Sequence, residues 1–123
     1  MPAMAAAVGT TDDVGNVANY VLSLSASTHD PQRAAKGQQK FAACAACHQA
    51  DGSGNPAIGA PDLTDDTWLY GGSIDSVIYA INNGINNAMP SFGNRLDAGK
   101  IRVLSAYVWQ LSNKTEAAAI PAR

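Results

Sequence analysis

Apolar residues recur at steps of three and four in three segments of this chain, and each stripe predicts an amphipathic helix. The three stripes are Val14, Val17, Val21 and Leu24; Ile74, Val77, Ile78 and Ile81; and Ile101, Leu104, Val108 and Leu111. Asp12 and Asp13 suit the first turn of the first helix, and Ser73 and Asp97 suit the N-caps of the other two. No strand pattern is present, so the sequence predicts an all-α fold.

A fourth helix is predicted to begin at Asp30-Pro31, where a capping acid precedes a proline at the first helical position. It is expected to run to about Ala46. Gly37 inside it costs about 1 kcal/mol relative to alanine, and close passage of another helix would explain this glycine. Loops are expected over 49–63 and 84–96, with a short helical turn capped by Thr64 between 64 and 68.

The residues Cys44-Ala45-Ala46-Cys47-His48 form the C-x-x-C-H signature of c-type haem attachment. On a helix, residues three and four apart share a face, so both thiols can bond one porphyrin while His48 reaches its iron. A zinc site would need four ligands, and a thioredoxin-like dithiol would accompany a βαβ pattern that is absent. A plain disulfide stays open, since the chain has two cysteines. The motif predicts one covalent haem c.

Composition adds limits to this interpretation. The chain has 123 residues and a hydrophobic fraction of 46%, which fits one globular domain plus some additional residues. Its net charge of −2 gives no reason to expect that it binds nucleic acid. No apolar run is long enough to span a bilayer, so no membrane contact is expected of this chain. The segment 1–8 is a poor signal peptide because no basic residue precedes its apolar run. Covalent haem implies the periplasm, so the export signal or anchor is expected to lie outside this sequence.

The second axial ligand has four candidates, Met89, Met4, Met1 and His29. Met89 lies in a loop about 40 residues after the haem motif and precedes Pro90, so its side chain is free to point inward. A lone methionine is often core filler, and His29 lies in a polar linker that suits a solvated residue. We predict His48 and Met89 as the iron ligands, a pair that raises the reduction potential and fills both axial positions.

Residues 30–112 resemble a class I cytochrome c domain. The resemblance rests on Gly37 and Phe41, the haem motif, Gly59-Ala60-Pro61-Asp62-Leu63, Met89-Pro90-Ser91-Phe92 and a last helix with Tyr107. In that family the first and last helices cross, with the glycine and the aromatic residues at the contact. The resemblance implies that Tyr107 or Trp109 packs over Gly37. It also implies that the Pro61 carbonyl accepts a hydrogen bond from His48.

Two stretches resemble a narrower group of cytochrome c domains. Trp68-Leu69-Tyr70-Gly71-Gly72 and Met89-Pro90-Ser91-Phe92-Gly93 resemble the second haem domain of the di-haem cytochrome c subunit of cbb3-type haem–copper oxidases. This resemblance implies that Trp68, Tyr70 and Arg95 contact the haem propionates. Packing or a surface charge is the alternative role of each.

The chain also contains an internal repeat. Val14-x-x-Val17-Ala18-x-Tyr20-Val21-Leu22-x-Leu24-Ser25 matches Ile101-x-x-Leu104-Ser105-x-Tyr107-Val108-Trp109-x-Leu111-Ser112. Met1-Pro2-Ala3 precedes the first copy much as Met89-Pro90-Ser91 precedes the second. We therefore expect residues 1–29, with a helix near 12–25, to be the remnant of a preceding haem domain plus a linker. Residues 30–112 would be the monohaem domain, and 113–123 a flexible tail.

The expected function is single-electron transfer by a His/Met-ligated haem in a cbb3-type oxidase subunit, without catalysis of its own. The expected partners are an electron-donor cytochrome and an acceptor haem domain or oxidase subunit, at the periplasmic face of the inner membrane. A dimer through residues 12–25 is left open. The alternatives are a free-standing soluble periplasmic monohaem carrier and, with less support, a haem sensor or peroxidase-like enzyme in which Met89 is displaced.

Overall fold

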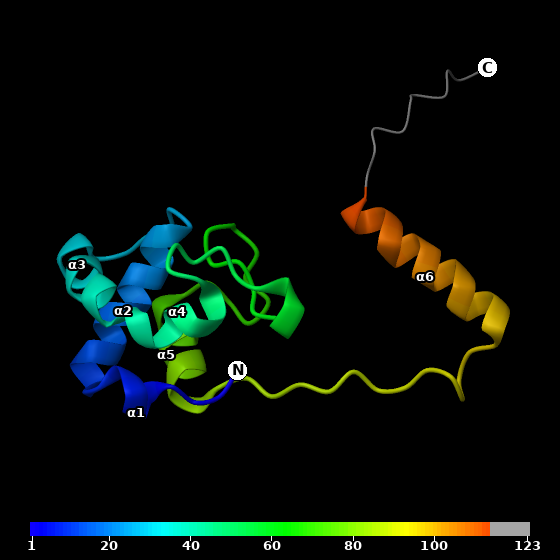
Figure 1. Cartoon of the computed structure of the whole chain (residues 1–123), viewed down its shortest axis with the longest axis horizontal. Helices are drawn as coiled ribbons and strands as arrows, with labels where there is room; N and C mark the ends of the chain where they lie inside the picture. Colours follow the sequence, from blue (N-terminus) through cyan, green and yellow to red (C-terminus); the bar gives the residue numbers. More distant parts are fainter. Residues whose placement is uncertain (114–123) are drawn as a thin grey trace, which may run out of the picture. The chain divides into compact units, whose positions relative to one another are not determined.

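The computed structural model describes residues 1–113, except the side chain of Ser112. Its elements are α1 (Ala5–Val8), α2 (Thr11–Leu24), α3 (Pro31–Lys40), α4 (Ala42–His48), the 3₁₀ helix η1 (Pro56–Ile58), α5 (Ile74–Asn83) and α6 (Ala98–Ser112) (Figure 1). Over the described range the only extended pairing is one isolated bridge between Asn55 and Ala60. The all-α prediction is confirmed. None of the described helices is long and apolar enough to cross a membrane.

Two compact units make up the chain, one from Met1 to Asn87 and one from Ala88 onward, and each is described by itself. The first unit contains every helix from α1 to α5, and the second contains α6. The haem motif on α4 therefore belongs to the first unit, and Met89 belongs to the second.

Three helix N-termini follow the capping residues that the sequence predicted, those of α3, α5 and α6. Asp30 accepts hydrogen bonds from the backbone N–H groups of residues 32 and 33, with Pro31 at the first helical position of α3. Ser73 caps α5 and Asp97 caps α6. Thr10 and Asp13 form a reciprocal capping box at the start of α2, which satisfies two backbone donors at once.

The helix expected from Asp30 to about Ala46 is instead two helices that meet at Phe41. The Phe41 N–H bonds the Gln38 carbonyl, and the Cys44 N–H bonds the Phe41 carbonyl at 2.8 Å. These bonds between residues three apart tighten the backbone locally and turn its direction. Phe41 itself is buried, so the core fixes the bend.

The helical turn expected at 64–68 does not form. Thr64 donates from both its backbone N–H and its hydroxyl to the Asp62 carboxylate, at 2.7 and 2.6 Å. Its side chain is therefore committed to the preceding residues rather than to a helix start. The Thr67 N–H bonds the Asp65 carboxylate, which continues the segment as successive side-chain-supported turns.

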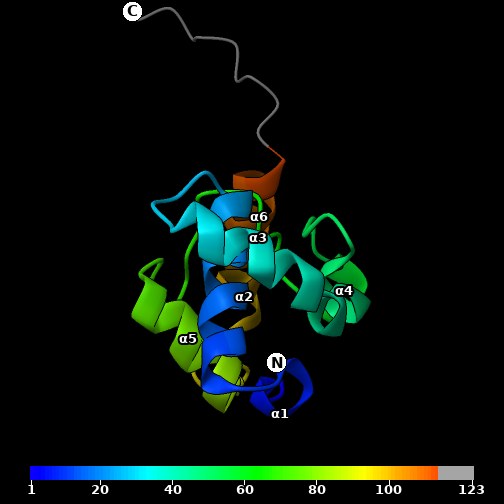
Figure 2. The same cartoon turned by 90° about the vertical axis from the view of Figure 1, so that its left-hand side faces the viewer.

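The core of the first unit lies where α2 packs on α3 and α5 (Figures 1 and 2). Val17 and Ala18 of α2 are completely buried. The ring of Tyr20 meets that of Phe41 edge to face, with centroids 5.1 Å apart. Residues before α3 supply most of the core, which consists of Val8, Val14, Val17, Ala18, Val21, Leu22, Phe41, Val77 and Ile81.

The backbone of α2 passes directly against Gly37 of α3. A Cβ atom added there would lie 2.0 Å from the Asn16 carbonyl oxygen and 2.8 Å from the Val17 nitrogen. The close helix passage expected over this glycine is confirmed. The expectation that Tyr107 or Trp109 would cover it is wrong, because the backbone of α2 fills this space.

Polar links also hold α2 to α3. Arg33 pairs with Asp12 at 3.1 Å and donates to the Asn16 amide oxygen at 3.0 Å. The buried Asn19 side chain accepts from the Asp30 N–H and donates to a carbonyl of its own helix. Since the apolar stripe of α2 is covered within the chain, the reason for expecting a dimer through this helix is removed.

In its described part, the second unit is a segment with a turn at 93–95 followed by α6, and the apolar stripe of this helix is exposed. Ile101, Leu104, Val108 and Leu111 are 37%, 48%, 60% and 52% exposed. In the preceding segment the Arg95 guanidinium lies over the Phe92 ring, 5.8 Å from its centroid. Of the tail expected over 113–123, only Asn113 belongs to the described residues.

Candidate haem site

The haem motif lies on α4, which begins immediately after the bend at Phe41. Cys44 is partly buried and packs against the core, whereas Cys47 is exposed. His48 is the last residue of α4 and is only 8% exposed. The helix thus carries both thiols and the imidazole on two consecutive turns, as the spacing predicted.

The orientation of His48 is fixed from outside its own helix. Its Nδ1 lies 3.0 Å from the backbone carbonyl oxygen of Pro61. A carbonyl oxygen only accepts hydrogen bonds, so Nδ1 must carry the proton and donate it. In the neutral imidazole the other ring nitrogen, Nε2, then keeps its lone pair, which is the form in which histidine binds a metal. The hydrogen bond expected between these two residues is present.

The loop from Gln49 to Leu63 brings the Pro61 carbonyl to His48. It folds back on α4 because the Gly54 N–H bonds the His48 carbonyl at 3.0 Å and the Leu63 N–H bonds the Gly52 carbonyl at 2.8 Å. A Cβ atom on Gly54 would lie 2.6–2.7 Å from backbone atoms of residues 60–62. The positioning role of Gly54 was missed from the sequence, although its place in the Gly52-Ser53-Gly54 turn signal was visible.

Replacing Gly54 with alanine is expected to lower the melting temperature and loosen the hold of Pro61 on His48. Its φ of +77° disfavours any side chain, and the added methyl would push against the chain at Pro61. Together these costs should reach about 1–3 kcal/mol. Thermal unfolding and the NMR signal of the His48 ring N–H measure the two effects.

Gly59→Ala is the matched control, because Gly59 also has a positive φ, +69°, but open space around its Cβ position. It isolates backbone strain from the clash with residues 60–62. Equal losses for the two variants would contradict the positioning role of Gly54.

The Cys44 thiol does not have the lowered pKa of a reactive cysteine. Burial raises the pKa of the Cys44 thiol, and the neighbouring Cys47 raises it further. Reactive cysteines of redox enzymes have lowered pKa values instead. Both cysteines are free thiols, and no group of three His, Cys, Asp or Glu side chains among the described residues is placed to hold a metal ion. The donor set of two thiols and one oriented imidazole fits haem c.

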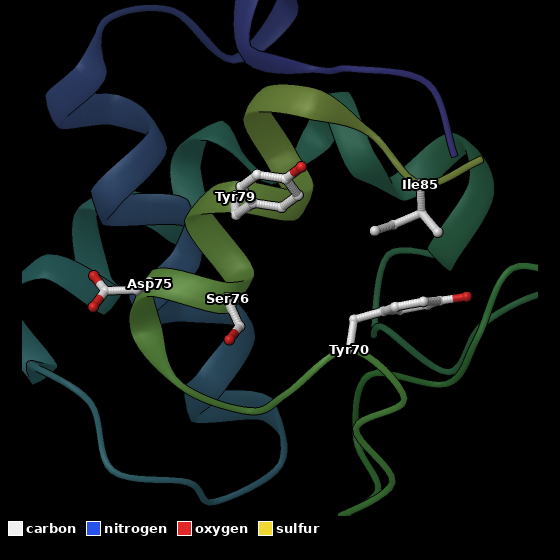
Figure 3. A pocket seen from close by; sticks show the side chains of 5 residues that line it. All are labelled: Tyr70, Asp75, Ser76, Tyr79 and Ile85. Atoms are coloured by element: carbon white, nitrogen blue, oxygen red, sulfur yellow. The ribbon is translucent and has the colours of Figure 1, made fainter. Parts of the chain in front are cut away.

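Trp68 and Tyr70, expected near the propionates, belong to the first unit. Trp68 is partly buried against the core, and its ring lies so close to Gly72 that a Cβ atom there would be 2.8 Å away. Tyr70 is 54% exposed, pairs with the Asn87 amide through its hydroxyl, and lines a hollow of about 390 Å³ with residues of α5 (Figure 3). Arg95 belongs to the second unit.

Among the methionines, Met89 is 89% exposed. Met4 is partly buried against the core, and its N–H bonds the Ile81 carbonyl at 2.8 Å. Met1 exchanges two backbone hydrogen bonds with Ile85, each 2.8 Å long. The segment from Met1 to Met4 therefore lies alongside the end of α5.

Comparison with known proteins places this site in a family. The family model described as cytochrome c oxidase, cbb3-type, subunit III matches residues 32–108, which include the haem motif, Pro61 and Met89.

Relatives match over most of the chain. The cbb3-type cytochrome c oxidase subunit CcoP of Rubrivivax gelatinosus is 52% identical over 119 residues, covering 97% of this chain and 39% of the relative. Subunit FixP of Azorhizobium caulinodans is 46% identical over 101 residues, covering 80% and 34%. Subunit CcoP of Cereibacter sphaeroides is 41% identical over 96 residues, covering 77% and 33%. The chain thus spans about a third to two fifths of the length of these relatives. It is a cytochrome c domain of class I fold and belongs to the family of cbb3-type cytochrome c oxidase subunit III.

Proposed function

We propose that this chain carries one haem c, bonded through Cys44 and Cys47 and ligated by His48, and that it transfers single electrons within a cbb3-type oxidase. The observation that carries the proposal is the hydrogen bond from His48 Nδ1 to Pro61, because it leaves Nε2 free for iron. Haem supplies the one-electron chemistry, since its iron cycles between two oxidation states.

Each protein group would have a distinct part in this function. The thioethers would fix the porphyrin to α4, so that its orientation does not depend on ligand exchange. The carbonyl of Pro61 would hold the imidazole plane and increase its basicity as a ligand. Reorganisation on electron transfer would then be small, and no bond-making chemistry is proposed for the domain.

Met89 is our proposed second ligand. Pro90 follows it, and its exposed side chain is free to reach the iron. A thioether ligand raises the reduction potential, and its presence would close the iron to small molecules. Contacts of Trp68, Tyr70 and Arg95 with the propionates remain part of the proposal.

The wider setting is proposed from the relatives, which are named as subunits of cbb3-type oxidases. We place the domain at the periplasmic face of the inner membrane, where c-type haem is attached. An electron-donor cytochrome and an acceptor haem domain or oxidase subunit would be its partners. Residues 1–29 would then be the end of a preceding haem domain in the parent subunit.

Intact-mass measurement after acid–organic extraction tests the cofactor. Protein made with c-type haem-attachment machinery is expected to keep the mass of one haem, because thioethers survive extraction. The double variant Cys44→Ala, Cys47→Ala should release all pigment under the same treatment. Haem that extracts freely from the unaltered chain, or a chain without pigment, would contradict the proposal.

A further inference from the structure

One residue beside the proposed iron ligand has a backbone conformation that suits glycine and not its own side chain. Gln49 follows His48 directly, and its φ and ψ angles are 66° and 162°. Almost only glycine adopts this region, because a Cβ atom there collides with the neighbouring backbone. The loop from 49 to 63 has a positive φ at four residues, and the other three are glycines, at 52, 54 and 59. Strain therefore remains at the one position next to His48.

The backbone around Gln49 holds this residue in its strained conformation. Its side chain is exposed, and no hydrogen bond within the described residues joins the side-chain amide to another group. The Gly52 N–H bonds the Gln49 carbonyl at 3.2 Å, and the Gly54 N–H bonds the His48 carbonyl at 3.0 Å. Together with the hydrogen bond from His48 to Pro61, these bonds close the loop. The strain at Gln49 therefore opposes the same closure that fixes the imidazole.

We infer that Gln49 is a positioning residue that sets how often the loop from 49 to 63 opens away from His48. Closing the loop strains Gln49 and opening relieves it, so the strain lowers the free energy of local opening. In the open state the Nδ1–H group of His48 loses the Pro61 carbonyl as its acceptor. Gln49 thus acts on the imidazole through the loop, without contacting the iron or the haem.

The consequence for electron transfer rests on the proposed function. A hydrogen bond from Nδ1–H to Pro61 makes the imidazole of His48 a more basic ligand, and a more basic ligand favours ferric iron. Opening of the loop weakens this effect, so Gln49 raises the reduction potential relative to a glycine at the same position. The opening itself rests on backbone geometry and does not require haem.

The variant Gln49→Gly in the full chain tests the inference, because glycine adopts the same angles without strain. Amide hydrogen exchange of Gly54 and Leu63, whose N–H groups help to close the loop, is expected to slow about fivefold or more. This factor is the relief of strain less the additional freedom that glycine gains in the open loop. Hydrogen exchange followed by NMR measures it. Unchanged or faster exchange at both amides would overturn the inference.

Two control variants separate backbone strain from other causes. Gln49→Ala removes the side-chain amide but keeps a Cβ atom in the strained region, so exchange should stay as in the unaltered chain. Ala50→Gly introduces glycine at the next exposed residue, whose φ is not positive, and should not slow exchange. If either control slows exchange as much as Gln49→Gly does, strain at Gln49 is not the cause and the inference is overturned.

Redox titration of the haem-loaded protein tests the effect on the iron. The reduction potential is expected to fall in Gln49→Gly and to stay unchanged in Gln49→Ala, since only glycine keeps Pro61 on His48 for longer. A potential that does not fall while exchange slows would overturn this part of the inference. A chain without haem would contradict the proposed function alone, because exchange of Gly54 and Leu63 still tests the opening of the loop.

Discussion

Replacing Gly37 with leucine is expected to cost about 3 kcal/mol or more of the free energy of unfolding, at or above the upper end of the usual range for overpacking. The reason is that its Cβ position is already 2.0 Å from the Asn16 carbonyl oxygen. Backbone atoms cannot turn aside as a flexible side chain does, so α2 would have to separate from α3. Val17 and Ala18, now completely buried, would lose part of their burial. Thermal or chemical unfolding measures the loss.

Two further variants sharpen this prediction. Gly93→Leu introduces the same side chain where the only neighbouring atom is 3.8 Å away, so it should be nearly neutral. Gly37→Ala should also destabilise, although alanine favours a helix by about 1 kcal/mol over glycine. A gain in stability for Gly37→Ala would show that α2 does not approach α3 as closely as the structure indicates.

Met89→Ala is expected to abolish the weak long-wavelength band of a methionine–iron bond in the ferric protein, and to lower the reduction potential. Loss of the thioether removes a ligand that favours the reduced state. The vacant axial position should also bind added imidazole or cyanide. Visible spectroscopy and redox titration measure these changes.

Met4→Ala is the informative control, because Met4 packs partly buried against the core of the first unit. It should lower stability and leave the band in place. We also predict that Met1 does not bind iron. A band that survives Met89→Ala but disappears in Met4→Ala or Met1→Ala would assign the ligand to the segment beside α5.

Much of the local structure could be predicted because it depends on near neighbours in the sequence. Asp30-Pro31, Ser73 and Asp97 began helices where they were expected, since a capping side chain bonds backbone only two or three residues away. The spacing of the haem motif is also local, because residues three and four apart share a face of one helix. The hydrogen bond of His48 was expected from the family resemblance, while the fold of the loop that delivers Pro61 was not.

Other features were decided by side-chain contacts that the helical patterns do not show. The bend at Phe41 exists because this ring is held in a core formed largely by residues 8–22. Thr64 bonds Asp62 instead of capping a turn, since the nearby carboxylate satisfies both of its donors. Neither the burial of Phe41 nor the hydrogen bonds from Thr64 to Asp62 can be recognised from the helical spacing of apolar residues.

The sequence by itself determined where α3, α5 and α6 begin, the family, and the motif that contains Cys44, Cys47 and His48. It also determined that Gly37 would be crossed by a helix, because only a close neighbour explains a glycine at that position. It could not determine which helix, since α2 and α6 carry the same apolar pattern. In the tertiary structure it is α2 that crosses Gly37, and side chains outside the shared apolar pattern hold it there. Asp12, Asn16 and Asn19 bond to α3 and its first residues, and the aliphatic stripe that both helices share cannot supply those bonds.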